Sequence, residues 1–218
     1  MSEDTVFALS SPVGGAIAIV RITGSGAYAA LGRVFRCKNA PEHRVMNYGH
    51  VIDSESGETI DSAMACFLEA PATYTGEDMA EIYIHGSRVI AKRTLSVLSR
   101  FLRPAEGGEF TKRAFMNGKL DLSQAEAVMD VISSVTEQGA RMAEEQLAGS
   151  IGSGIKDIED RLIDILSGVE AALDYPDELE EDTVSALGSE LAPIIDKLDY
   201  LIRGGNAARI FRETGGVG

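Results

Sequence analysis

The chain has 218 residues, 44% of them apolar, which is enough for one large or two smaller hydrophobic cores and excludes a largely disordered protein. Residues 1–119 carry 13 basic and 13 acidic side chains, whereas residues 120–218 carry 7 basic and 21 acidic ones, a net charge of −14. A surface this acidic repels phosphate backbones over about 8 Å at physiological salt, so we do not expect the second half to bind nucleic acid non-specifically.

The first elements alternate between strand and helix. Val6–Leu9 and the β-branched run Ala16–Ile22 predict two strands, and Ser25–Phe35 has a helical pattern. Gly24 marks the break between the second strand and this helix. Residues 1–35 therefore predict two strands followed by a helix.

Further strands follow in the same half. Tyr48–Asp53 and Thr59–Leu68 predict strands joined by a short polar loop, which suits an antiparallel hairpin. Met79–His85 alternates polar or large side chains with Ala and Ile, and it leads through Gly86 into an amphipathic helix over about Ser87–Leu102. Hairpin-like pairs with interspersed helices favour an α+β domain over a doubly wound parallel sheet.

After Lys119 nearly every segment is compatible with helix. Asp121 and Ser123 are both candidate N-caps, and Glu126 follows Ser123 at the spacing of a capping box. A later helix carries one apolar stripe at steps of three and four, which predicts packing against a bundle or another subunit. The stripe consists of Ile155, Ile158, Leu162, Ile165, Val169 and Leu173.

Two helix ends are predicted farther along. Pro176 lacks a backbone donor and disfavours helical geometry in the residue before it, so the striped helix should stop near Asp174–Pro176. Another helix is expected over about Thr183–Ile202, ending at Gly204–Gly205. The second half therefore reads as an all-α segment.

The two cysteines, Cys37 and Cys66, lie far apart in a chain with no CxxC pattern and no signal peptide. This fits reduced thiols in a cytoplasmic protein. No apolar run approaches the roughly 20 residues that span a bilayer, so we expect no membrane segment. Three scattered histidines without an acidic cluster also make a metal site unexpected.

Four segments in fixed order carry a family resemblance. The longest is Gly108–Ala127, which is twenty residues with only Met116 left free and is highly specific. The others are Ser11-Pro12 with Gly15–Arg21, Tyr74–Asp78 with Glu81 and His85-Gly86, and Asp174–Glu178. Together they resemble the MnmE family, also called TrmE, of tRNA-modification GTPases. One departure is Ser87, which stands where a second glycine commonly follows His-Gly.

The resemblance implies an architecture. Residues 1–119 would form a tetrahydrofolate-binding and dimerisation domain similar to that of the glycine cleavage T-protein. Residues 120–218 would form the first half of a helical domain, with the GTPase domain and its GTP, Mg²⁺ and K⁺ lying beyond residue 218. No phosphate-binding GxxxxGK[ST] loop occurs in these residues, so we expect no GTP hydrolysis by this chain alone.

The resemblance also implies a folate site at Arg21, Glu81 and Lys119. A carboxylate at Glu81 suits the adjacent N–H donors of a reduced pterin, and burial within an apolar strand demands partners for it. Arg21 suits a formyl or carbonyl oxygen or a folate carboxylate, and Lys119 supplies a cation near the pterin or one-carbon group. The alternatives are a solvated strand-face Glu81, a strand-end Arg21 that reaches water, and a turn lysine.

Three functions follow as expectations. In the first, the chain holds 5-formyl- or methylene-tetrahydrofolate as a one-carbon donor for modifying the wobble uridine of certain tRNAs. It would act as a homodimer with the flavoprotein MnmG (GidA), and tRNA would contact the assembled complex. In the second, it is a dimerisation and docking scaffold without functional folate binding. The third, an independent one-carbon transferase, lacks the acidic catalytic residue and second domain that it requires.

Overall fold

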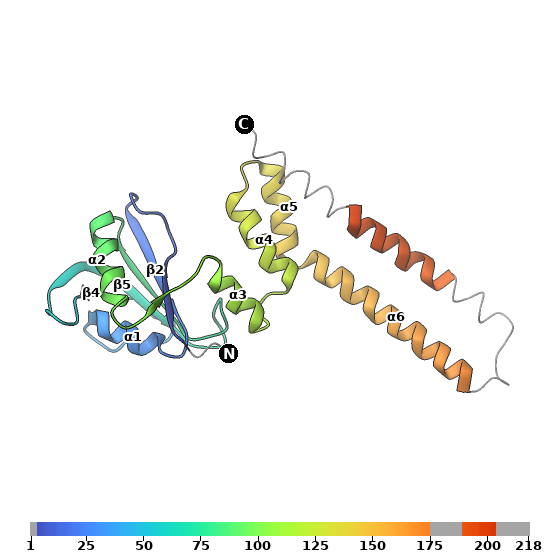
Figure 1. The fold of residues 1–218 in the computed structure, drawn as a ribbon, viewed down its shortest axis with the longest axis horizontal. Coiled ribbons are helices and arrows are strands. Elements are labelled where there is room, and N and C mark those ends of the chain that lie inside the picture. The colour runs from blue at the N-terminus through green and yellow to red at the C-terminus, as the bar shows by residue number, and fades with distance from the viewer. Residues whose placement is uncertain (1–3, 175–188, 204–218) are drawn as a thin grey trace. The chain divides into compact units, whose positions relative to one another are not determined.

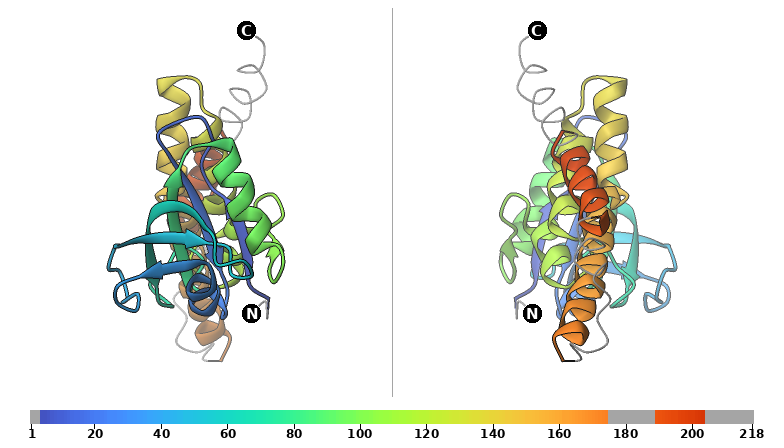
Figure 2. Two further views of the ribbon diagram at one scale, coloured as in Figure 1. Left: turned by 90° about the vertical axis from the view of Figure 1, so that its left-hand side faces the viewer. Right: turned by 90° about the vertical axis from the view of Figure 1, so that its right-hand side faces the viewer.

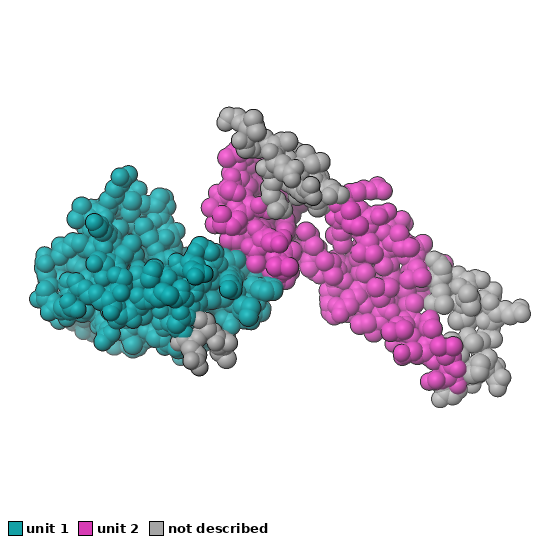
Figure 3. Space-filling model, viewed as in Figure 1, with its two compact units in different colours: residues 1–120 teal, residues 121–218 magenta. Residues whose placement is uncertain are grey.

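The computed structural model describes residues 4–174 and 189–203 and divides the chain into two compact units, residues 1–120 and residues 121–218 (Figure 3). Unit 1 combines a sheet with helices, and the described part of unit 2 is helical (Figure 1). The predicted α+β part followed by a helical part is therefore confirmed. Similarity to the T-protein fold stays a prediction.

A seven-stranded sheet forms the centre of unit 1, in the order β3-β4-β5-β6-β2-β1-β7. Neighbouring strands are antiparallel, except that β1 and β7 are parallel. The five predicted strands and the hairpin are confirmed, whereas β3 and β7 are too short to show an alternating pattern. The strands are β1 (Val6–Leu9), β2 (Ile17–Thr23), β3 (Phe35–Cys37), β4 (Asn47–Ile52), β5 (Thr59–Leu68), β6 (Met79–His85) and β7 (Arg103–Pro104).

Two helices, α1 (Ala27–Val34) and α2 (Arg88–Leu98), pack on one face of this sheet, as the two side views show (Figure 2). Their apolar residues join alternate residues of the central strands in a single core, because successive strand residues point to opposite faces. The strand residues in this core include Ala18, Val20 and Ile22 of β2 and Ala80, Ile82 and Ile84 of β6. Residues at the intervening positions, including Glu81, therefore face away from α1 and α2.

Both helices end earlier than predicted. Phe35 adopts extended geometry, with φ −129° and ψ 126°, and begins β3 instead of closing α1. The second helix stops at Leu98 although the apolar pattern continues, because Phe101 and Leu102 pack against the core from a turn outside the helix. The predicted break at Gly24 is confirmed by its φ of +124°, a conformation that favours glycine.

A buried ion-pair network fastens helix α3 (Glu109–Met116) within unit 1. The Arg113 side chain is only 5% exposed and donates to the carboxylates of Asp4, Glu77 and Glu109. Arg103 also pairs with Asp4 and Glu109. We call these five residues the Arg113 cluster, and it joins the N-terminus, β7 and the loop before β6 to α3.

Unit 2 begins with a pair of helices, α4 (Leu122–Ser133) and α5 (Glu137–Leu147). The capping box is formed by Asp121 and Gln124, so the predicted pair of Ser123 and Glu126 is wrong. The reason is that the helix starts at Leu122, which leaves Ser123 inside its first turn, where its hydroxyl donates to Asp121. Gln124 and Gln146 each donate to a backbone carbonyl across the pair.

Helix α6 (Ser150–Asp174) carries the predicted apolar stripe, and residues 189–203 are also helical (Figure 1). Ile158 of the stripe is 5% exposed, but Leu162 is 43% and Leu173 is 73% exposed, so the described residues cover the stripe only in part. The predicted residues Tyr175–Pro176, 183–188 and Gly204–Gly205 lie outside the described ranges. No helix within residues 4–174 and 189–203 is long and apolar enough to cross a bilayer.

Candidate functional site

Glu81 lies in the middle of β6, on the sheet face opposite α1 and α2. The pairing register places Arg21 of β2 directly beside it on one flank and Cys66 of β5 on the other. Directly paired residues of antiparallel strands project to the same face, so these three side chains are neighbours. The site is therefore assembled from three central strands and rests on the most regular part of the unit.

The Glu81 carboxylate has a protein donor on each oxygen. Arg21 Nε donates to Oε1 at 2.7 Å, and the Tyr83 hydroxyl donates to Oε2. The Glu81 side chain is 12% exposed and that of Arg21 is 38% exposed, so the pair lies at the boundary between core and solvent. Partners for the buried carboxylate thus come from the protein itself, and burial alone does not require a ligand.

The environment of Glu81 raises the pKa of two neighbouring groups, Tyr83 and Cys66. Burial, followed by the hydrogen bond to the Glu81 carboxylate, raises the pKa of Tyr83 far above its ordinary value. Burial also raises the pKa of the Cys66 thiol, and the charge of Glu81 adds to that effect. Both groups are consequently uncharged at neutral pH, and Tyr83 keeps the proton that it donates to Glu81.

The pair retains capacity for a ligand. A carboxylate offers about four acceptor positions, of which Arg21 and Tyr83 occupy one on each oxygen. Among the described residues, the two terminal nitrogens of Arg21 make no hydrogen bond. The arrangement can accept two adjacent N–H groups at Glu81 and donate to an oxygen from Arg21.

Lys119 lies elsewhere in unit 1. Its Nζ donates to the Pro71 carbonyl at 3.1 Å, and its aliphatic stem runs alongside Gly76. No hydrogen bond or ion pair joins Lys119 to Arg21 or Glu81 in the part of the chain that the structure describes. The structure therefore brings together two of the three predicted site residues, whereas the third follows α3 and contacts the loop before β6.

That loop, residues 70–78, is held by its own acidic side chains. Glu77 accepts a hydrogen bond from Thr23 of β2 and pairs with the buried Arg113. Asp78 accepts from the Ala70 backbone amide. Glu77 and Asp78 thus have structural roles. They anchor the loop whose Pro71 carbonyl accepts the hydrogen bond from Lys119.

Sequence reasoning missed Tyr83 and Cys66. Tyr83 follows Glu81 by two residues in a strand with period-two alternation, and this spacing is a signal that could have identified it. Cys66 becomes a neighbour of Glu81 only through the register of β5 against β6, which the sequence pattern does not specify.

His85 ends β6 in a fixed orientation. Its backbone amide and its Nδ1 contact the two carboxylate oxygens of Asp61, each at 2.8 Å. Asp61 is nearly buried, with its side chain 7% exposed. Within residues 4–174 and 189–203, no group of three or more His, Cys, Asp or Glu side chains is placed to hold a metal ion.

Comparison with known proteins covers both units. Residues 5–119 match the family model described as "GTP-binding protein TrmE N-terminus", and residues 122–215 match that of the "MnmE helical domain". Three curated relatives share the description "tRNA modification GTPase MnmE".

The relative from Finegoldia magna is 42% identical over 220 residues, which cover 97% of this chain and 48% of the relative. The one from Acetivibrio thermocellus is 40% identical over 217 residues, with 97% and 47% covered. The one from Streptococcus pyogenes serotype M3 is 41% identical over 216 residues, with 96% and 47% covered. The chain thus spans about half the length of these relatives.

Proposed function

Because the chain belongs to the MnmE family of tRNA modification GTPases, we propose that unit 1 binds a reduced folate through Arg21 and Glu81. The folate is 5-formyl- or methylene-tetrahydrofolate, and when bound it supplies a one-carbon group for modification of the wobble uridine of tRNA. The observation that carries this proposal is the Arg21–Glu81 pair on β2 and β6, with acceptor positions left on both carboxylate oxygens.

The chemistry of a pterin fits this pair. Its pyrimidine ring presents a ring N–H beside an exocyclic amine, and two parallel hydrogen bonds to one carboxylate form a strong and oriented contact. The same ring carries an oxygen next to the N–H, which suits a terminal nitrogen of Arg21. Both residues sit on central strands, so the contact is held by the sheet.

Lys119 serves in this proposal as a second cation. Its Nζ donates to the Pro71 carbonyl, and the exposed ammonium can exchange that carbonyl for an anionic or carbonyl group of the ligand. A compact charge on a flexible stem is suited to such an exchange. The fold that supports the site is, in this proposal, related to the folate-binding domain of the glycine cleavage T-protein.

The remaining activities belong to the intact protein. GTP hydrolysis with Mg²⁺ and K⁺ takes place in a nucleotide-binding domain outside residues 1–218, consistent with the name of the relatives. The protein works as a homodimer with the flavoprotein MnmG, and tRNA contacts that assembly. The acidic unit 2 contributes no general affinity for RNA, because its net charge repels phosphate.

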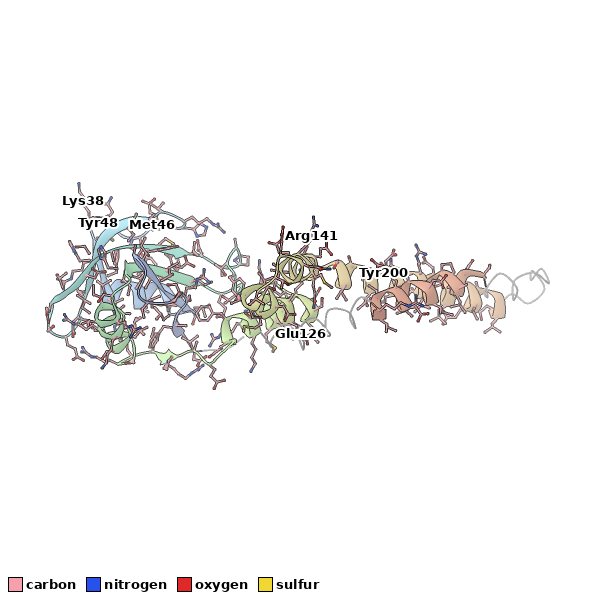
Figure 4. The ribbon with its side chains drawn as sticks, turned by 90° about the horizontal axis from the view of Figure 1, so that it is seen from above. Lys38, Met46, Tyr48, Glu126, Arg141 and Tyr200 are labelled. Atoms are coloured by element: carbon pink, nitrogen blue, oxygen red, sulfur yellow. The ribbon has the colours of Figure 1, made fainter. Side chains whose placement is uncertain are left out.

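A second candidate function is that of a dimerisation scaffold. Ile17 and Met64 lie on the same sheet face as Glu81 and are 60% and 44% exposed. Tyr48, paired with Met64 and 67% exposed, extends this apolar surface to β4 and projects from unit 1 in Figure 4. Large exposed apolar side chains grouped on one face are typical of protein interfaces.

Calorimetric titration of the 218-residue chain with 5-formyltetrahydrofolate separates the two functions. Saturable binding that is lost in Glu81→Ala and kept in Glu58→Ala supports the folate site, because Glu58 is a surface glutamate, 63% exposed, that pairs with Arg93. No heat from a chain that sediments as a dimer supports the scaffold and refutes the folate proposal.

A further inference from the structure

Arg21 and Tyr83 each donate a hydrogen bond to a different oxygen of the Glu81 carboxylate. Arg21 reaches Oε1 from the neighbouring strand β2, and Tyr83 reaches Oε2 from two residues farther along β6. Tyr83 is itself fixed between Met64 of β5 and Ile19 of β2, with which it pairs across the sheet. The phenol therefore has a defined position from which to donate.

The second donor fixes the plane of the carboxylate. The last torsion of a glutamate side chain is broad, so a single bond from Arg21 to Oε1 leaves the other oxygen able to swing. A donor on Oε2 removes that freedom and leaves one acceptor position on each oxygen. A ligand edge with two adjacent N–H groups needs both positions at once.

The other side chains around Glu81 cannot replace the phenol. In the described chain, the titratable or charged groups set against the carboxylate are Arg21 from β2, Cys66 from β5 and Tyr83 from β6 itself. A buried thiol is a weak donor, and its pKa is raised by burial and by Glu81. Arg21 is already bonded to the opposite oxygen, so Oε2 depends on Tyr83.

We propose that Tyr83 is a positioning residue of the folate site. It fixes the orientation of the Glu81 carboxylate so that both oxygens can accept hydrogen bonds from two adjacent N–H groups of the ligand. This inference rests on the proposed function and adds to it a residue outside Arg21, Glu81 and Lys119. Tyr83 acts through Glu81, and its removal affects ligand binding through the orientation and charge of that carboxylate.

The test is Tyr83→Phe in the 218-residue chain, titrated with 5-formyltetrahydrofolate and with its 2-desamino analogue, which lacks one of the two adjacent N–H donors. We expect affinity for 5-formyltetrahydrofolate about 10- to 150-fold weaker than that of the unmodified chain, the effect of losing one hydrogen bond to a charged group. The analogue should lose much less affinity, because it needs only one of the two carboxylate oxygens. A purely structural role of Tyr83 would weaken the binding of both compounds equally.

Two further variants complete the test. Tyr28→Phe removes a phenol from α1, on the opposite side of the sheet, and should leave the affinity for both compounds unchanged. Glu81→Asp keeps the charge but moves the carboxylate back by one methylene from Arg21 and Tyr83, and it should lose the discrimination between the two compounds even if Tyr83→Phe fails to fold.

The outcomes separate this inference from the proposed function. If the unmodified chain binds the folate and Tyr83→Phe either binds it equally or loses affinity equally for both compounds, the positioning role is refuted and the folate site stands. If the unmodified chain shows no binding, the proposed function fails and the inference fails with it.

Discussion

Replacing Arg113 with methionine should destabilise unit 1 more than any surface ion-pair variant. The guanidinium is 5% exposed and donates to Asp4, Glu77 and Glu109 at 2.8 to 3.1 Å. Glu77 and Glu109 are 10% and 12% exposed, so neither carboxylate can turn fully to water once its partner is gone. The variant leaves buried charge without compensation, which is the costly way to break an ion pair.

The magnitude follows from which partners remain. Removing one member of a buried pair costs about 3–5 kcal/mol. Arg103 still pairs with Glu109, and Asp4 is 48% exposed and can reach water, so Glu77 carries most of the penalty and the lower value applies. A loss of about 3 kcal/mol corresponds to a thermal midpoint about 12 °C lower, at about 4 °C per kcal/mol for a unit of this size.

Far-UV circular dichroism of the 218-residue chain during heating and urea titration measures this change. The matched control is Arg93→Met, which breaks a single pair with Glu58 whose side chains are 41% and 63% exposed. Such a pair contributes about 0–1 kcal/mol. Equal midpoints for Arg113→Met and Arg93→Met would show that the Arg113 cluster does not secure the fold.

Three further predictions concern two glycine positions, the N-cap of α4 and the stability of unit 1 at acidic pH. Gly86→Ala should lower the unfolding midpoint, since its Cβ would lie 2.0 Å from the Gly15 carbonyl oxygen. Gly32→Ala in α1 should instead raise stability by about 0.5–1 kcal/mol, because its Cβ would meet no atom within 4 Å. Asp121→Ala should lose about 1 kcal/mol in urea unfolding of unit 2, because the capping box of α4 is removed. Arg103, assisted by Arg113, holds the pKa of Glu109 at about 2, below its ordinary value near 4.5. The resulting stabilisation is complete above about pH 4.5 and is lost as the pH falls toward 2, so unfolding free energy should drop over that window and less steeply in Glu109→Gln.

The strands were predictable because apolar and polar residues alternate along them, and this alternation follows which side chains are buried. Ala18, Val20 and Ile22 alternate with exposed or partly exposed residues in β2, which is the expected pattern for a sheet covered on one face. In β6 the alternation is one of residue type, since Ala80, Ile82 and Ile84 lie in the core and Glu81 and Tyr83 lie between them. Helix ends were less predictable, since a packed turn such as Phe101–Leu102 continues the apolar pattern after the helical hydrogen bonds have stopped.

The candidate site was predictable in its residue types and not in its contacts. Family motifs indicated Arg21, Glu81 and Lys119, and the structure places the first two in direct contact and the third against Pro71. The argument from burial was that Glu81 must have partners and that a bound ligand would supply them. Tyr83 and Arg21 supply them, and only the folded register reveals that.

The contact between Arg21 and Glu81 is a consequence of strand register, which the core itself determines. The two residues are 60 positions apart and meet because β2 and β6 pair from Ile17 opposite His85 to Thr23 opposite Met79. A slip of β2 by one residue against β6 would turn Arg21 into the apolar core and expose Val20, which is fully buried. That exchange costs several kcal/mol in desolvated charge and lost apolar burial, so the same residues that stabilise the sheet also hold the carboxylate in place. The position of the Glu81 carboxylate is therefore coupled to the core packing of unit 1.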